Sequence, residues 1–136
     1  MIKFSANLSM LFTELDFLER FSAARAAGFE YVEYLFPYDF SPEQIRDQLT
    51  ENNLKQVLFN LPAGNWADGD RGITCLPDRI DEFKDGVNTA IVYAEELGCT
   101  QLNALAGIPT LESNTDSVKQ TFVNNLDFAA SKLRDK

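Results

Sequence analysis

Residues 55–79 have the sequence KQVLFNLPAGNWADGDRGITCLPDR. The segment begins with the apolar run VLF at 57–59, which is typical of a buried strand. A polar loop follows, and three glycines interrupt it: Gly64, Gly69 and Gly72. A strand, a long polar loop and then a helix form the arrangement in which βα proteins carry their functional groups. We therefore expect the rest of the chain to be a scaffold that presents this loop.

The same order of strand and helix recurs along the chain, as an internal repeat. An alternating pattern predicts a strand at 2–9, a run rich in aromatic and branched residues predicts one at 31–36, and two further strands are predicted at 55–60 and 101–107. Helices are predicted at 13–27, 41–53 with its caps, 78–97 and 114–133. This alternation favours an α/β fold with one parallel sheet, helices packed outside it and right-handed crossovers. Four βα units are too few to close an eight-stranded barrel.

The predicted helices carry start signals and apolar stripes. Thr13-Glu14-Leu15-Asp16 resembles a capping box, and Ser41-Pro42-Glu43-Gln44 combines a serine N-cap, a proline at the first position and a glutamine at the third. The third helix has an apolar stripe formed by Ile80, Phe83, Val87, Ala90, Ile91, Ala94 and Leu97. The stripe expected for the fourth helix consists of Val118, Phe122, Leu126, Ala129 and Leu133.

Composition limits the class of protein. The chain has 136 residues, which suits one domain, and its 45% hydrophobic and 24% charged residues are ordinary for a globular protein. A net charge of −9 offers no basic patch, so we expect no nucleic-acid partner. No apolar run approaches the length of a membrane span, so we expect no membrane partner and a cytoplasmic location. Cys75 and Cys99 fit no zinc spacing, and we expect free thiols.

Four polar residues occupy matching places near the ends of the predicted strands: Asn7, Glu33, Asn60 and Asn103. In a parallel sheet these places lie at one rim, where amides can hold a hydroxyl or carbonyl group of a substrate. A hydrogen-bonded barrel interior explains the asparagines equally well. Glu33 lies inside a mostly apolar strand, which is unfavourable for a carboxylate unless it is paired or protonated, so structural pairing and a catalytic part both remain open.

The loop adds three candidates for substrate binding. Trp66, Arg71 and Arg79 can form a cover over an anionic substrate, with an arginine holding a carboxylate through two parallel hydrogen bonds. Exposed loop arginines are more often simply solvated. The chain has no histidine, so no Ser/His or Cys/His catalytic pair is present. These residues alone do not make a complete active site.

Four segments together resemble the hydroxypyruvate isomerase family of xylose-isomerase-like TIM barrels: FSANLSMLFTE, AARAAGFEYVEYLFPYDFSPEQI, LFNLPAGNWADGDRGITCLPDR and LNALAG. The similarity runs in order through essentially the whole chain and corresponds to the N-terminal half of the family. It implies a fold that is a parallel (βα)4 half of a TIM (β/α)8 barrel, with residues 1–136 as a single half-barrel segment.

The resemblance also implies an aldose–ketose isomerase that acts on a small acidic carbonyl substrate. The family pair is hydroxypyruvate and tartronate semialdehyde, and members that act on 2-oxo-tetronates are hard to distinguish from it. In the family, two glutamates move the proton through an enediol and a divalent metal, Mg or Mn, polarises the oxygens. Those residues lie on later strands, so we expect no catalytic residue and no metal ligand in this chain.

The implied half-barrel has two unpaired sheet edges, so we expect self-association or pairing with a C-terminal half, and no activity of the chain alone. A non-catalytic binding or assembly module is the alternative of a different class. An endonuclease related to the same superfamily is less favoured, because the chain is acidic and lacks histidine.

Overall fold

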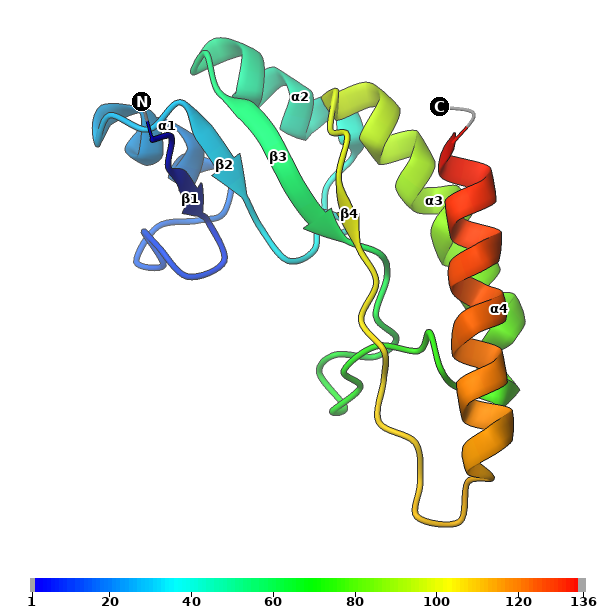
Figure 1. Ribbon diagram of the computed structural model, residues 1–136. Coiled ribbons are helices and arrows are strands. Elements are labelled where there is room, and N and C mark those ends of the chain that lie inside the picture. Colours follow the sequence, from blue (N-terminus) through cyan, green and yellow to red (C-terminus); the bar gives the residue numbers. More distant parts are fainter. Residues whose placement is uncertain (1, 135–136) are drawn as a thin grey trace. The chain divides into compact units, whose positions relative to one another are not determined.

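The computed structural model describes residues 2–134, in which strands and helices alternate as the sequence predicts (Figure 1). The elements are β1 (Ser5–Asn7), α1 (Glu19–Ala26), β2 (Tyr31–Glu33), α2 (Pro42–Glu51), β3 (Lys55–Asn60), a 3₁₀ turn (Pro77–Arg79), α3 (Ile80–Leu97), β4 (Leu102–Asn103) and α4 (Thr115–Arg134). The strands form one sheet in the order β1-β2-β3-β4, with β1, β2 and β3 paired in parallel. The predicted parallel (βα)4 fold is confirmed.

The chain divides into two compact units. The first contains residues 2–59 with Val92–Leu102, and the second contains Asn60–Ile91 with residues 103–134.

Aromatic side chains form the core of the first unit. The ring of Phe17 lies 5.5 Å from that of Phe21 and 5.2 Å from that of Tyr34, edge to face in both cases. Tyr93 packs its ring 5.1 Å from that of Tyr38 and donates a hydrogen bond from its hydroxyl to the Phe40 carbonyl, at 2.8 Å. Offset and edge-to-face rings of this kind contribute beyond their buried area.

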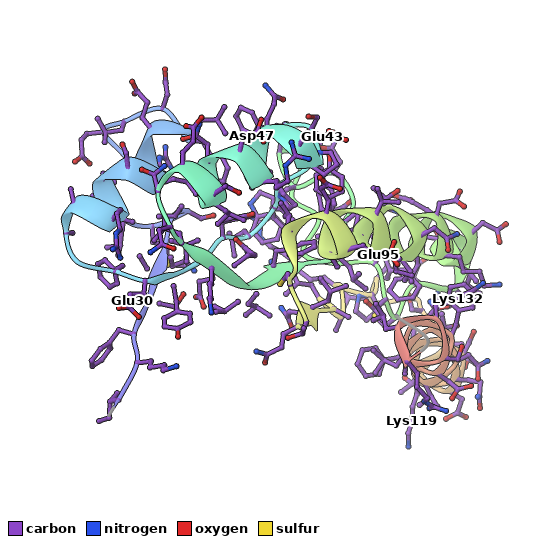
Figure 2. All side chains as sticks on the ribbon, turned by 90° about the horizontal axis from the view of Figure 1, so that it is seen from above. Glu30, Glu43, Asp47, Glu95, Lys119 and Lys132 are labelled. Atoms are coloured by element: carbon purple, nitrogen blue, oxygen red, sulfur yellow. The ribbon has the colours of Figure 1, made fainter. Side chains whose placement is uncertain are left out.

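The predicted start of α2 is confirmed in atomic detail. The Ser41 hydroxyl accepts a hydrogen bond from the Gln44 amide, and the Gln44 side chain accepts one from the Ser41 amide. Asn53 has a φ of 49°, a left-handed conformation that ends the helical run. On the outer side of this helix, Glu43 and Asp47 project away from the sheet as an exposed acidic face (Figure 2).

The predicted start of α1 is wrong. The capping box expected at residues 13–16 lies in a series of turns, and the helix begins only at Glu19. The reason is local: Leu15 donates its amide hydrogen bond to Phe12, three residues back, and Phe12 itself has a φ of 60°. The helix has Leu18 as its N-cap, without a side-chain capping hydrogen bond, and the Glu19 carboxylate accepts from the Asp16 amide in the turn before it.

The strands are shorter than their sequence patterns predict. After β4, the Leu105 carbonyl accepts from the Thr74 hydroxyl at 2.7 Å and the Ala106 carbonyl accepts from the Cys75 amide at 2.8 Å, so these groups bond to the loop and the strand does not continue. The strand patterns predict that Val32, Leu58 and Leu102 are buried in one contiguous sheet. Val32 is buried, whereas Leu58 and Leu102 are half-buried. Neighbouring side chains on a strand point to opposite faces, and Phe59 is the β3 residue that enters the aromatic core.

In the second unit, the buried face of α4 differs from the predicted stripe. Leu126 is exposed, and the buried positions are Thr121, Asn125 and Ala129. The Asn125 amide donates to the Thr74 carbonyl at 2.9 Å, which ties the helix to the loop after β3. By contrast, the stripe predicted for α3 is buried at Phe83 and Val87, as expected. Lys132, in the last turn of α4, places its ammonium nitrogen 5.8 Å from the centroid of the Phe128 ring.

Cys75 and Cys99 are free, as predicted, and both are buried. Among the described residues, no helix combines the length and the apolar character that crossing a membrane requires.

Candidate functional site

Each of the four predicted polar residues is the last residue of its strand. Asn7 ends β1, Glu33 ends β2, Asn60 ends β3 and Asn103 ends β4. The sequence pattern therefore placed them correctly along the strands. Each compact unit holds one pair of them.

In the first unit, the side chains of Asn7 and Glu33 form a pair. The two residues are register partners in the β1–β2 ladder, and the Asn7 amide nitrogen donates to Glu33 Oε1 at 3.1 Å. The side-chain oxygen of Asn7, Oδ1, accepts a hydrogen bond from the backbone N–H of Ser9 at 3.0 Å, which fixes the orientation of the Asn7 side-chain amide. Glu33 Oε2 makes no hydrogen bond to a described residue. The partner of Glu33 is thus a neutral amide, and one carboxylate oxygen remains available to accept a hydrogen bond.

In the second unit, Asn60 and Asn103 form a similar pair. The Asn103 amide nitrogen donates to Asn60 Oδ1 at 3.0 Å, and the backbone amide of Leu61 donates to the Asn103 carbonyl at 2.9 Å. Asn60 is buried, whereas Asn103 is exposed. A buried amide that is oriented by an exposed neighbour can present a defined donor or acceptor to a polar ligand.

The loop places Trp66 and Arg71 in direct contact. The guanidinium carbon of Arg71 lies 4.2 Å from the centroid of the Trp66 ring, and Arg71 Nη1 donates to the carbonyls of Trp66 and Asp70 at 3.2 and 2.6 Å. A guanidinium stacked on an indole ring at this distance is a cation–π pair. The structure therefore brings together two of the three residues expected in the loop.

Arg79, the third, is bound to two carboxylates. Its Nε and Nη2 donate to the two oxygens of Glu82 at 2.7 and 2.8 Å, and its Nη1 donates to Asp70 Oδ2 at 2.6 Å. Glu82 first and Asp70 second raise the pKa of Arg79. In turn, the Arg79 hydrogen bond and the Asn65 amide hold the pKa of Asp70 below its ordinary value.

Asp70 was not among the residues predicted for the site, yet it organises the loop. Its Oδ2 accepts from the Asn65 amide at 2.6 Å as well as from Arg79. A Cβ on Gly64, which has a φ of 80°, would lie 2.3 Å from this oxygen, so only glycine fits beneath the ion pair. The glycine was visible in the sequence, but its reason, a carboxylate six residues later, was not.

The second half of the loop is buried, which the sequence did not indicate. Gly72 to Cys75 are all buried, and a Cβ on Gly72 would lie 2.1 Å from the Leu105 carbonyl oxygen. This close approach accompanies the antiparallel bridge between Gly72 and Ala106. Only the first half, residues 64–71, is thus open to a ligand.

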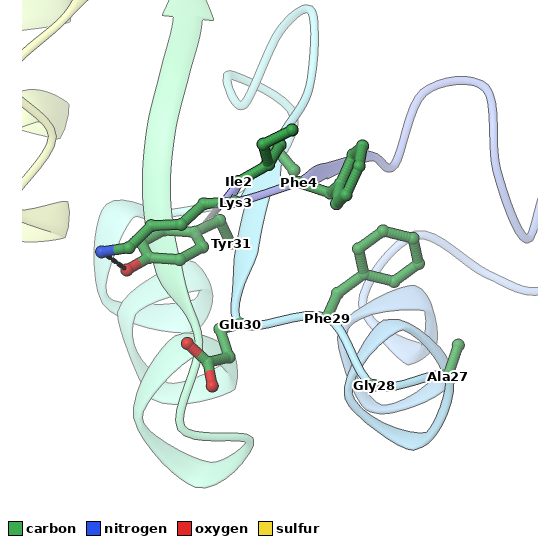
Figure 3. Close-up of a pocket in the computed structure, with 9 residues that line it drawn as sticks. Ile2, Lys3, Phe4, Ala27, Gly28, Phe29, Glu30 and Tyr31 are labelled. Atoms are coloured by element: carbon green, nitrogen blue, oxygen red, sulfur yellow. Dashed lines mark hydrogen bonds between the residues drawn. The ribbon is translucent and has the colours of Figure 1, made fainter.

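A cleft in the first unit lies at the other end of the strands from the Asn7–Glu33 pair. Its lining residues come from the start of β1 and from the segment that leads into β2, and Lys3 donates to the Tyr31 hydroxyl at 2.8 Å (Figure 3). None of the described residues at the C-terminal ends of the strands lines this cleft. The polar candidates at those strand ends and in the loop therefore lie outside it.

Across residues 2–134, no three His, Cys, Asp or Glu side chains gather closely enough to hold a metal ion. The carboxylates of Asp70 and Glu82 are bound to Arg79, and that of Asp68 accepts from the Asn65 side chain, so they do not form the oxygen-rich set that Mg²⁺ prefers. The described residues therefore do not fit a metal site.

Comparison with known proteins adds the wider context. The family model for xylose isomerase-like TIM barrels matches residues 21–136. The chain is 49% identical over 133 residues to a hydroxypyruvate isomerase of Escherichia coli and 47% identical over 133 residues to a 2-oxo-tetronate isomerase of Pectobacterium atrosepticum. Each match covers 98% of this chain, but only 52% of the first relative and 51% of the second. The chain thus spans about half the length of the curated relatives that it matches.

Solved structures agree with this fold. A crystal structure described as AP endonuclease, family 2, from Brucella melitensis matches with a TM-score of 0.95 and 47% identity, over 99% of this chain and 52% of that one. A D-allulose 3-epimerase from Methylomonas sp. matches with a TM-score of 0.73 at 18% identity, over 99% of this chain and 48% of that chain, which supports the fold alone. The alternating parallel fold, the strand-end polar residues and the family match lead to one conclusion: the chain belongs to the xylose isomerase-like TIM barrel family.

Proposed function

We propose that the complete protein is an isomerase that interconverts hydroxypyruvate and tartronate semialdehyde. The observation that carries this proposal is the 49% identity to a hydroxypyruvate isomerase over 98% of the chain. In this reaction a proton leaves C3 of hydroxypyruvate, an enediol forms, and a proton is added at C2 while the C3 hydroxyl becomes an aldehyde. Substrate and product are isomers, so the step needs no oxidant or reductant.

Within this reaction the described residues bind substrate and do not move the proton. The buried Asn60 amide and the Asn7 amide are oriented by hydrogen bonds, which lets them hold a hydroxyl or carbonyl oxygen in a fixed place. Glu33 Oε2 can accept a hydrogen bond from a substrate hydroxyl. Trp66 and Arg71 supply a flat apolar surface and a positive charge, which suit a small carboxylate.

A 2-oxo-tetronate substrate is the second candidate, supported by 47% identity to a 2-oxo-tetronate isomerase. The two substrates share the 2-oxo carboxylate and differ by one hydroxymethyl unit. Steady-state rates with hydroxypyruvate and with a 2-oxo-tetronate, measured on the same preparation, decide between them through the ratio of kcat/KM.

The whole-protein assay tests the proposal. We expect the chain alone to be inactive with Mg²⁺ or Mn²⁺, and activity to appear when it is mixed with a separately produced segment that supplies the other half of the relatives' length. A chelator should then remove the activity. Activity of the chain alone would contradict the expectation that the catalytic residues lie in the other half.

Two further outcomes would contradict the isomerase itself. Binding of the second segment without any isomerisation would favour a non-catalytic assembly module. Cleavage of DNA that contains abasic sites would favour an endonuclease, as the description of the Brucella structure suggests for that protein.

A further inference from the structure

The loop contains two arginines whose hydrogen bonds are arranged differently. Arg79 donates hydrogen bonds to carboxylates of this chain from both sides of its guanidinium. The edge formed by Nε and Nη2 donates to Glu82, and Nη1 donates to Asp70. Arg71 uses only Nη1, which donates to two backbone carbonyls, and stacks its plane on Trp66. Its Nε and Nη2 make no hydrogen bond to a described residue.

The unused edge of Arg71 has the geometry that carboxylates require. Nε–H and Nη2–H point in parallel from one side of the planar group, and a carboxylate accepts both at once. In Arg79 the same edge already holds a carboxylate, that of Glu82, so this chain itself shows the arrangement. Arg71 is oriented by the ring and the carbonyls, so little side-chain freedom remains to be lost when a ligand binds.

We propose that Arg71 is the residue that binds the substrate carboxylate, and that Asp70 and Arg79 are positioning residues that hold the loop for it. The assignment rests on the proposed function for the identity of the substrate. Arg79 makes no contact with substrate: it joins Glu82 on α3 to Asp70, and Asp70 in turn fixes Asn65 at the start of the Trp66 turn. Gly64 lies against both charged groups and excludes a side chain there.

The charges around the loop fit this division. Asp70 and Glu82 both form ion pairs with Arg79. Asp70 also interacts electrostatically with Arg71, but the Arg71 guanidinium donates hydrogen bonds only to backbone oxygens and stacks on an aromatic ring. The positive charge available to an anion in this part of the loop is therefore that of Arg71. A neutral carbonyl compound of the same size lacks the group that this charge recognises.

Arginine modification tests the assignment without relying on turnover. Phenylglyoxal is applied to the complete protein, and peptide mapping follows the labelling of each arginine with time. We expect Arg71 to be labelled well before Arg79, hydroxypyruvate to protect Arg71, and dihydroxyacetone, which lacks the carboxylate, to give no protection. Labelling of Arg79 first, or equal protection by both ligands, would overturn the proposal.

Kinetics of variants give a second test. Arg71→Ala should raise KM for hydroxypyruvate about tenfold or more with a much smaller change in kcat, since a charge-assisted bidentate contact is lost. Arg71→Lys should recover little, because an ammonium cannot form the two parallel bonds. Arg46→Ala removes an arginine whose described ion pairs are with Asp47 and Glu96, and it serves as the matched control with an unchanged KM.

The positioning role has its own readout. Trp66 is the only tryptophan among these 136 residues, so the emission of this chain, measured alone, reports the loop directly. Asp70→Asn should shift this emission and raise both KM and the labelling rate of Arg79, whereas Arg71→Ala should not expose Arg79. If Asp70→Asn leaves the emission and KM unchanged, the positioning role is wrong.

The two proposals can fail separately. Protection of Arg71 by hydroxypyruvate in a protein without isomerase activity would contradict the proposed function and leave the arginine assignment standing. Isomerase activity with no protection of Arg71 would contradict the assignment and leave the function standing.

Discussion

The aromatic core of the first unit and the loop of the second are held together by different forces. Phe21 and Phe59 are fully buried and pack against other rings, so their contribution comes from apolar area and close contact. The loop around Asp70 has few apolar contacts of this kind and depends on charged groups and glycine. We therefore expect the aromatic core to contribute most of the stability and the loop around Asp70 to serve ligand recognition. Variants can test this division.

The largest expected effect is loss of packing in the core. Phe59→Ala should lower the free energy of unfolding by about 3–5 kcal/mol, because it removes a buried ring and leaves a cavity. Leu58→Ala, on the neighbouring half-buried position, is the control and should cost clearly less. Urea denaturation followed by circular dichroism measures both. Equal losses at the two positions would mean that the two faces of β3 are equally buried in solution.

Alkaline pH should weaken the same core. Burial is the main cause that raises the pKa of Tyr34 and Tyr38 above the ordinary tyrosine value. The unfolded chain therefore loses these protons first, so their stabilising effect is complete below about pH 10 and is lost as pH rises toward the folded-state values. Stability should fall by about 1.4 kcal/mol per pH unit for each tyrosine in that range.

Tyr34→Phe separates this effect from packing. The Tyr34 hydroxyl is buried and has no hydrogen-bond partner in the structure, so its removal should leave stability at neutral pH unchanged or slightly higher. The variant should also lose part of the alkaline dependence. A clear loss of stability at neutral pH would show that the hydroxyl is satisfied in solution.

Features that depend on the spacing of residues along the chain could be predicted from the sequence in both regions. The start of α2, the stripe of α3 and the position of all four polar residues at strand ends follow from short-range patterns and were predicted correctly. The start of α1 was wrong because a capping motif at residues 13–16 competes with turns that begin at Asn7, whose carbonyl accepts from the amides of Met10 and Leu11. Local propensity alone cannot rank these alternatives.

The site was less visible because its decisive contacts are made across the loop. Sequence patterns alone offer no reason to distinguish Arg71 from Arg79, since both arginines follow the same glycine-rich stretch. The distinction arises from partners: Asp70 lies nine residues before Arg79, and only the folded loop brings the two within 2.6 Å. The buried polar face of α4 escaped prediction for the same reason, because Asn125 is satisfied by a carbonyl 51 residues away.

Asn125 is intermediate between the apolar core and the charged loop, because it is a polar residue that is buried and hydrogen-bonded. Asn125→Ala should cost about 1–3 kcal/mol, because it leaves the buried Thr74 carbonyl without its donor. Asn124→Ala is the matched control: Asn124 is exposed and accepts only from Gln120 on the same helix, so its loss should lie within about 0.5 kcal/mol. Thermal unfolding of the two variants measures the difference. A small effect at both positions would mean that water replaces the lost amide.

The smallest effect on stability is expected for the loop itself, and acid pH is the most sensitive way to observe it. The pKa of Asp70 is held below its ordinary value, first by Arg79 and then by the Asn65 amide. A lowered folded-state pKa means that the ion pair is intact above the ordinary aspartate value of about 4 and is lost only as pH falls through the lower folded-state value. The emission of Trp66 should thus stay constant from neutral pH to about pH 4 and change below it.

The charged groups that surround Asp70 determine how this result is interpreted. Arg79 pairs directly with Asp70 and the Arg71 guanidinium interacts with it electrostatically, while Glu82 is bound to Arg79, and Asp68 accepts from the Asn65 side chain. Asp70→Asn should abolish the acid transition because no carboxylate is left to protonate there, whereas Asp47→Asn on α2 should leave it in place. The urea midpoint should barely differ among the three proteins, because partly exposed ion pairs add little stability. A transition that survives in Asp70→Asn would assign the acid response to Glu82 or Asp68, and the loop would then be held by a different contact from the one that positions Arg71.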